Sequence, residues 1–125
     1  MPMSNAERTN RTDWGREARA TMRGRCMGCG TKQSTHIHEI ERRSQSPTRW
    51  AHRSNYLLLC RVCHAGAFDS MPHAEQLAYK LFWDPEHYDL DAWLRLRDPE
   101  LKAPLRVMAG SVTYFLTDLR CKFDG

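Results

Sequence analysis

Apolar and polar residues follow a strand-like pattern in the middle of the chain and a helical spacing in its second half. In STHIHEI (34–40), β-branched residues alternate with polar ones, which predicts a short strand. The apolar run YLLLC (56–60) predicts a second strand or an extended entry to the cysteines that follow. Apolar residues then recur at helical spacing over 72–83 and 84–97. Residues 110–120 form a stretch too short to decide between a strand and a helix, and we favour a helix.

The remaining segments are mostly polar. Residues 1–20 are rich in Arg, Thr and Asn, which predicts a loose arm with a helical stretch around 14–22. CMGCG (26–30) predicts a tight turn, 42–55 a long loop, and a helix is expected to begin after Cys63. Four aromatic residues are expected in the core rather than on a base-stacking surface: Phe82, Trp83, Tyr88 and Trp93.

The length of 125 residues predicts one domain with a modest core. Within it we expect a basic N-terminal arm (1–22), a cysteine-bearing core (23–70) and a helical C-terminal extension (71–125). The first residues lack the apolar region of a secretory leader, and no apolar stretch approaches the ~20 residues of a membrane span. We therefore expect a soluble, cytoplasmic protein that does not enter a membrane.

Four of the five cysteines form two Cys-x-x-Cys pairs, Cys26 with Cys29 and Cys60 with Cys63. In a reducing compartment, such pairs favour a shared metal over disulfides. Four thiolates complete a tetrahedral structural zinc site, so we predict Zn²⁺ there. The alternative is two unrelated buried thiol pairs. Cys121 is expected to be an ordinary thiol rather than a ligand.

The net charge of +4 conceals an asymmetry. Residues 1–64 hold 12 Lys/Arg against 5 Asp/Glu, whereas residues 65–125 hold 7 against 10. Basic charge concentrated on the cysteine-bearing half attracts polyanions through phosphate contacts and counterion release. The alternative is an ordinary solvated basic surface.

Histidines, a glutamate and an asparagine lie between and beside the cysteine pairs. In order, the chain reads CMGC, then HIHEI with His38 and Glu39, then Asn55 in SNYLLLC, then CRVCH with His64. This ordered set resembles the HNH endonucleases, which belong to the ββα-metal nucleases. Within that family it is similar to the small phage-type proteins in which two Cys-x-x-Cys pairs bind a structural zinc ion. The resemblance covers residues 26 to about 68, roughly a third of the chain.

The resemblance implies an α+β fold, with a small ββα-metal core stapled by the four-cysteine zinc site and additional C-terminal helices. It places His38 and His64 as ligands of a catalytic Mg²⁺ or Mn²⁺ and Glu39 as the general base. Asn55 would either position the hairpin loop or help to hold the site. A neutral imidazole binding through Nε2 leaves coordination positions open for phosphate and water. The cation then shields the phosphate and stabilises the leaving oxygen.

One position departs from the family pattern, because Glu39 occupies the position where most members have a histidine that acts as the general base. A carboxylate with an ordinary pKa near ~4.3 is a weak base at neutral pH. Either Glu39 is the base or an oxygen ligand and His38 takes the other role, or the site is impaired. In a shifted register, His38 would be the base and His36, on the same strand face, would replace Ile37 as ligand. We favour an active variant.

The expected function is hydrolysis of DNA phosphodiester bonds, with arginines clamping the flanking phosphates. The candidates are Arg42, Arg43, Arg49, Arg53 and Arg61. A phage origin would place the protein in a bacterial cytoplasm, with packaging or replication proteins as partners. The sequence does not predict an oligomeric state. The main alternative is a non-catalytic, zinc-ribbon-like nucleic-acid-binding module. A thiol redox protein fits poorly, because no βαβ pattern surrounds the cysteines.

Overall fold

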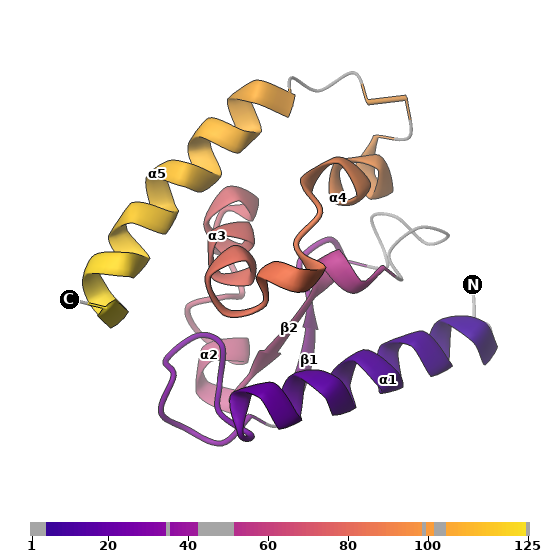
Figure 1. The fold of residues 1–125 in the computed structure, drawn as a ribbon, viewed down its shortest axis with the longest axis vertical. Helices are drawn as coiled ribbons and strands as arrows, with labels where there is room; N and C mark the ends of the chain where they lie inside the picture. Colours follow the sequence, from indigo (N-terminus) through magenta and orange to yellow (C-terminus); the bar gives the residue numbers. More distant parts are fainter. Residues whose placement is uncertain (1–4, 35, 43–51, 99, 102–104, 125) are drawn as a thin grey trace.

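A computed structural model describes residues 5–34, 36–42, 52–98, 100–101 and 105–124 (Figure 1). These residues form an α+β fold with five α-helices and one two-stranded sheet, which confirms the predicted fold class at that level. The elements in chain order are α1 (Asn5–Met22), β1 (His36–Glu39), the 3-10 helix η1 (Arg53–Asn55), β2 (Tyr56–Leu59), α2 (Arg61–Ala65), α3 (His73–Trp83), the 3-10 helix η2 (Pro85–His87), α4 (Leu90–Arg97) and α5 (Leu105–Asp124).

The two strands form an antiparallel hairpin, and its register decides which side chains share a face. His38 pairs with Leu57, and Glu39 pairs with Tyr56. Because side chains alternate along a strand, His38 and Leu57 lie on one face while Glu39 and Tyr56 lie on the other. All four residues of β2 are fully buried, so this strand is covered on both faces.

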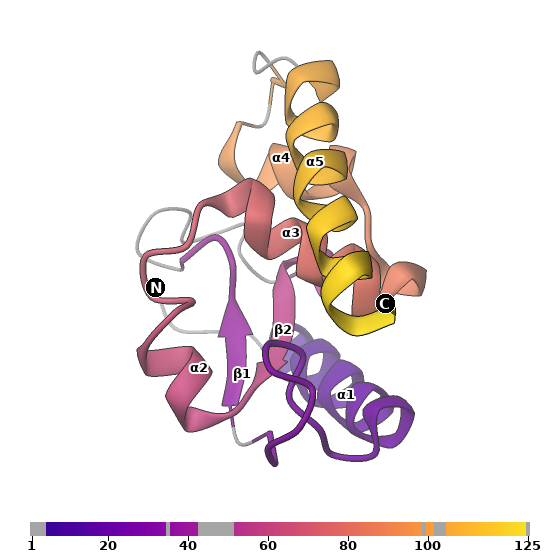
Figure 2. The ribbon, with the colours of Figure 1, turned by 90° about the vertical axis from the view of Figure 1, so that its left-hand side faces the viewer.

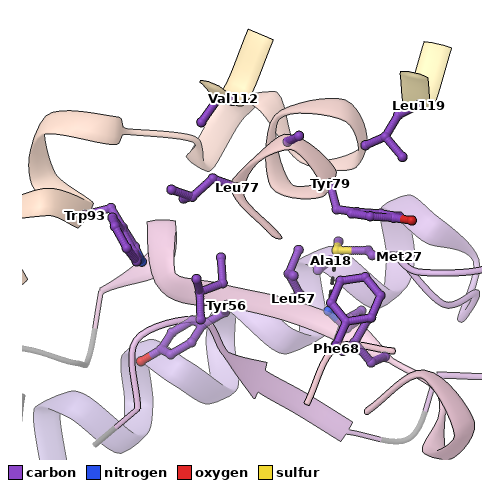
Figure 3. Close-up of a cluster of buried hydrophobic side chains, with 14 of the residues drawn as sticks. Ala18, Met27, Tyr56, Leu57, Phe68, Leu77, Tyr79, Trp93, Val112 and Leu119 are labelled. Atoms are coloured by element: carbon purple, nitrogen blue, oxygen red, sulfur yellow. Dashed lines mark hydrogen bonds between the residues drawn. The ribbon is translucent and has the colours of Figure 1, made fainter. Parts of the chain in front are cut away.

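Different helices cover the two faces of β2. The ring of Tyr56 lies 5.4 Å from the ring of Trp14 on α1, whereas Leu57 lies on the side of α3 (Figure 3). Helix α5 packs on the outer side of α3, where Val112 and Leu119 are buried (Figures 1 and 3). The order of layers is therefore α1, hairpin, α3 and α5 (Figure 2).

The described part of the N-terminal segment differs from the expectation of a loose arm. Residues 5–22 form a continuous helix whose buried side chains are Trp14, Ala18 and Met22, four positions apart. That spacing places the three side chains on one stripe facing the hairpin, while the charged residues face solvent. Three apolar positions were too few for the pattern to predict the full length of this helix.

The second half of the chain is helical as predicted, with different boundaries. The expected helix over 84–97 is divided into η2 and α4, because the Asp89 side chain accepts a hydrogen bond from the amide of Ala92 at 3.0 Å and starts a new helix. The predicted helix at 110–120 lies within the longer α5. Trp93 is fully buried, and the other three aromatic residues of the predicted set pack against the core.

A buried lysine joins three elements. Lys80 of α3 is fully buried, and its Nζ donates to the Tyr56 carbonyl and to Asp84, each at 2.8 Å. The Nζ also lies 4.3 Å from the centre of the Trp14 ring. Asp84 accepts further hydrogen bonds from Trp14 and His87, both at 2.9 Å. This network fixes α1, β2 and α3 relative to one another.

Candidate functional site

The four cysteines of the two Cys-x-x-Cys pairs lie together. Their Sγ atoms are all within 4.8 Å of one another, and within the described ranges they are the only cluster of three or more side chains suited to a metal ion. Cys26 and Cys29 lie in the turn after α1, while Cys60 caps the N-terminus of α2 and Cys63 lies within that helix. The arrangement can hold a metal ion such as zinc, as predicted.

Backbone amides face the sulfur atoms, as in metal-binding knuckles. Cys26 Sγ accepts from the amides of Gly28 at 3.1 Å and Cys60 at 3.2 Å, and Cys60 Sγ accepts from the amide of Cys63 at 3.5 Å. A Cβ atom at Gly28 would lie 3.0 Å from Cys63 Sγ, so a larger residue at that position would crowd the site.

The electrostatic environment differs among the thiols. Burial raises the pKa of Cys26 and of Cys63 above the usual thiol value. Burial also acts to raise the pKa of Cys29, but hydrogen bonds from the amides of Thr31 and Lys32 lower it to about 6. The thiolate is the form of cysteine that binds a metal ion. The positive charge of a bound metal ion would therefore stabilise the deprotonated form of these buried thiols. Cys121 is exposed on α5 and is not part of this cluster.

Three histidines form a second cluster next to the cysteines. His36 and His38 lie on the same face of β1, and His64 lies in the last turn of α2. The ring centre of His64 is 4.7 Å from that of His36, with the planes nearly parallel, and 5.3 Å from that of His38, with the planes nearly perpendicular. Helix α2 begins at Arg61 rather than after Cys63, so His64 lies near its end and not at its start.

His38 is buried and held by a residue that the sequence did not indicate. Its Nε2 lies 2.7 Å from Oε1 of Gln76 on α3. Burial lowers the pKa of His38 to about 4, partly opposed by the bond to Gln76, so the ring is neutral at pH 7. The expected ligand atom was Nε2, but that atom is occupied by Gln76. The lone pair for a cation would therefore be on Nδ1. No motif in the sequence points to Gln76.

Glu39 does not join the imidazoles. It lies on the opposite face of β1, where its carboxylate is 3.5 Å from the guanidinium of Arg11 on α1. Arg11 also donates to the Ile37 carbonyl at 3.1 Å. The strand alternation that brings His36 and His38 together thus directs Glu39 towards α1.

Asn55 ties the two ends of the hairpin loop together. Its side chain is fully buried, accepts from the Glu41 amide at 2.6 Å and donates to the Glu41 carbonyl at 3.0 Å. Its Oδ1 also accepts from Nε1 of Trp93 at 2.9 Å, and its carbonyl accepts from the Ile40 amide. This position fits the loop-holding role that the resemblance implied for Asn55.

A polar cavity of about 290 Å³ opens beside His38. The polar residues of its lining are His38, Glu39, Arg42, Asp69, Ser70, His73 and Gln76. The guanidinium of Arg42 donates to the Asp69 carbonyl at 3.0 Å and remains largely exposed. A phosphate oxygen in this cavity would therefore meet the Arg42 cation, a hydroxyl group and imidazole groups, but also the Asp69 carboxylate, which lies 3.5 Å from the Arg42 guanidinium.

Two of the other predicted DNA-binding arginines, Arg53 and Arg61, lie away from this cavity. Arg53 is paired with Glu17 at 2.7 Å and bonds Asn10 at 2.8 Å, on the α1 side. Arg61 is exposed on α2. Arg43 and Arg49 lie outside the described residues.

No protein-family model, curated protein or solved structure matches this chain. No helix in the described segments has the length and apolar character needed to cross a membrane.

Proposed function

We propose that this protein is a metal-dependent endonuclease of the HNH type that hydrolyses phosphodiester bonds in DNA. The observation that supports it most is the approach of His38 on β1 to His64 on α2, with 5.3 Å between the ring centres. These residues are far apart in sequence and carry the order expected from the resemblance. The cysteine cluster and Asn55 hold the two elements in place.

In this proposal, zinc occupies the cysteine cluster, and His38 and His64 hold a catalytic Mg²⁺ or Mn²⁺. When bound, that cation neutralises phosphate charge and makes a coordinated water more acidic. His36 replaces Glu39 as the proton acceptor, because it lies on the same face as the other two imidazoles. An imidazole is also a better base than an ordinary carboxylate near neutral pH.

The cavity beside His38 is the proposed seat of the scissile phosphate. Arg42 can contact a phosphate oxygen there through charge-assisted hydrogen bonds. The surplus of basic residues in the first half of the chain would attract the rest of the DNA backbone.

A plasmid-nicking assay in Mg²⁺ or Mn²⁺ tests the proposal. His38→Ala and His64→Ala should each lower the cleavage rate at least 100-fold while the protein retains its zinc. His87→Gln is the matched control, because His87 bonds Asp84 rather than the imidazole cluster. Undiminished cleavage by the His38 and His64 variants would exclude the proposal.

The role of Glu39 needs a separate comparison. If His36 accepts the proton, His36→Ala should stop cleavage, and Glu39→Ala should reduce it less than 10-fold. The reverse result would return the general-base role to Glu39 and require its side chain to leave Arg11.

A second candidate is a non-catalytic, zinc-ribbon-like module that binds nucleic acid. The observation that favours it concerns the candidate metal ligands: within the described residues, the four cysteines are the only group of three or more side chains placed to hold a metal ion. On this alternative, labelled duplex DNA would bind with strong salt dependence. Plasmid DNA would stay intact across a series of divalent metals.

A further inference from the structure

Gln76 joins the helical second half of the chain to the imidazole cluster. The side chain lies in α3, is 4% exposed and makes two hydrogen bonds. Its Oε1 is 2.7 Å from His38 Nε2, and its Nε2 donates to the Met71 carbonyl at 2.8 Å. Gln76 and Met71 both lie outside the hairpin and α2.

These two bonds determine the tautomer of His38. A backbone carbonyl can only accept a hydrogen bond, so the contact with Met71 fixes the amide nitrogen of Gln76 on that side. The amide oxygen then faces His38 and needs a donor. A neutral imidazole carries a single N–H, so the proton of His38 is on Nε2 and the lone pair is on Nδ1.

We propose that Gln76 is a positioning residue that holds His38 in the Nε2–H tautomer and presents Nδ1 to the catalytic cation. This inference rests on the proposed nuclease function. Metal-binding histidines usually donate their second ring N–H to an acceptor, and losing that acceptor commonly weakens metal affinity or activity 10- to 100-fold. Gln76 provides such an acceptor, and Met71 holds the amide in the required orientation.

The inference gives the C-terminal helices a role in the chemistry. Helix α3 packs over β2 (Figure 3), and the same helix fixes the orientation of a ring in β1. A ββα segment without α3 would keep the histidines but lose the acceptor for the His38 N–H.

Two variants separate positioning from general damage to the fold. Gln76→Leu removes the acceptor at similar volume, whereas Gln76→Glu retains an oxygen that can accept from His38. The matched control is Gln33→Leu, because Gln33 is exposed and lies beside Gly24. Circular dichroism and zinc content establish that each variant is folded.

The tautomer is measured first, on zinc-loaded protein without any catalytic cation. Nitrogen-15 NMR of the six histidines, with His38 assigned by its loss in His38→Ala, should show Nε2 protonated and Nδ1 bare. Gln76→Leu should weaken this preference, and Gln76→Glu should retain the Nε2 proton. A wild-type His38 protonated on Nδ1 would overturn the inference.

Manganese binding is measured next, by the paramagnetic broadening of the His38 signals. We expect binding at least 10-fold weaker in Gln76→Leu, substantially recovered in Gln76→Glu and unchanged in Gln33→Leu. Unchanged tautomer and affinity in Gln76→Leu, in a wild-type protein that cleaves DNA, would overturn the inference and leave the nuclease proposal intact. Wild-type protein that binds no manganese and cleaves no DNA would overturn both.

Discussion

Replacing Asn55 by leucine tests how much the loop-holding contacts contribute to the free energy of unfolding. Leucine has a similar volume but no polar atoms, so the variant removes hydrogen bonds without opening a large cavity. Three bonds are lost in a fully buried setting: those with the Glu41 amide, the Glu41 carbonyl and Trp93 Nε1.

The size of the effect follows from the groups left behind. A buried polar group that loses its partner costs about 1–3 kcal/mol, and three such groups sharing one site are not additive. We therefore expect Asn55→Leu to lower the free energy of unfolding by about 4 kcal/mol, near the lower part of the summed range. That is a large part of the 5–15 kcal/mol typical of a domain.

Urea unfolding of zinc-loaded protein, followed by circular dichroism, measures this loss. Trp93→Phe removes the indole donor and part of the ring volume at a fully buried position, and we expect a loss of about 2–4 kcal/mol. In the double variant there is no indole N–H to be left without an acceptor, which is one cost of Asn55→Leu alone. The combined loss should therefore fall short of the sum of the two single losses by about 1 kcal/mol. A loss below 1 kcal/mol for Asn55→Leu, or full additivity with Trp93→Phe, would refute the reasoning.

Three further predictions concern the cysteine cluster and the buried lysine. Chelation, or Cys60→Ser, should remove zinc and unfold the hairpin, whereas Cys121→Ser should retain one zinc per chain by elemental analysis. Gly28→Ala should destabilise the protein by about 1–3 kcal/mol in thermal unfolding, because its Cβ meets a cysteine sulfur, whereas Gly110→Ala, with open space around it, should stabilise by up to about 1 kcal/mol. Burial alone would raise the pKa of Asp84, but the charge of its lysine partner and three hydrogen bonds lower it below 3.8. The folded carboxylate therefore contributes stability above that pH and loses it as the pH falls through the folded pKa. Asp84→Asn should weaken this acid dependence in pH-resolved urea titrations, while destabilising the protein at pH 7 by about 3–5 kcal/mol through the unpaired lysine.

The sequence predicted the elements whose signal is local. The alternation in STHIHEI and the apolar run in YLLLC correspond to β1 and β2, and the spacing of the two Cys-x-x-Cys pairs led to the cysteine cluster. These patterns work because strand alternation and metal geometry constrain residues that are close in sequence.

The parts that sequence reasoning missed depend on contacts between distant elements. Glu39 was considered as the base from its place in a motif, but its face of the strand is set by pairing with β2 and by Arg11 on α1. Gln76 appears in the sequence as an ordinary helical residue, and only the packing of α3 brings it to His38. A single sequence carries no signal for either contact.

The complete burial of β2 also limits how this protein can be divided. Leu57, Leu58 and Leu59 are fully buried, and each such side chain contributes about 1.5–3 kcal/mol relative to exposure to water. A fragment of residues 23–70 would lack both covering helices and expose the apolar faces of this strand to other copies. Transplanting the hairpin and α2 alone into another scaffold should therefore produce aggregates, and the smallest unit suitable for engineering includes α1 and α3.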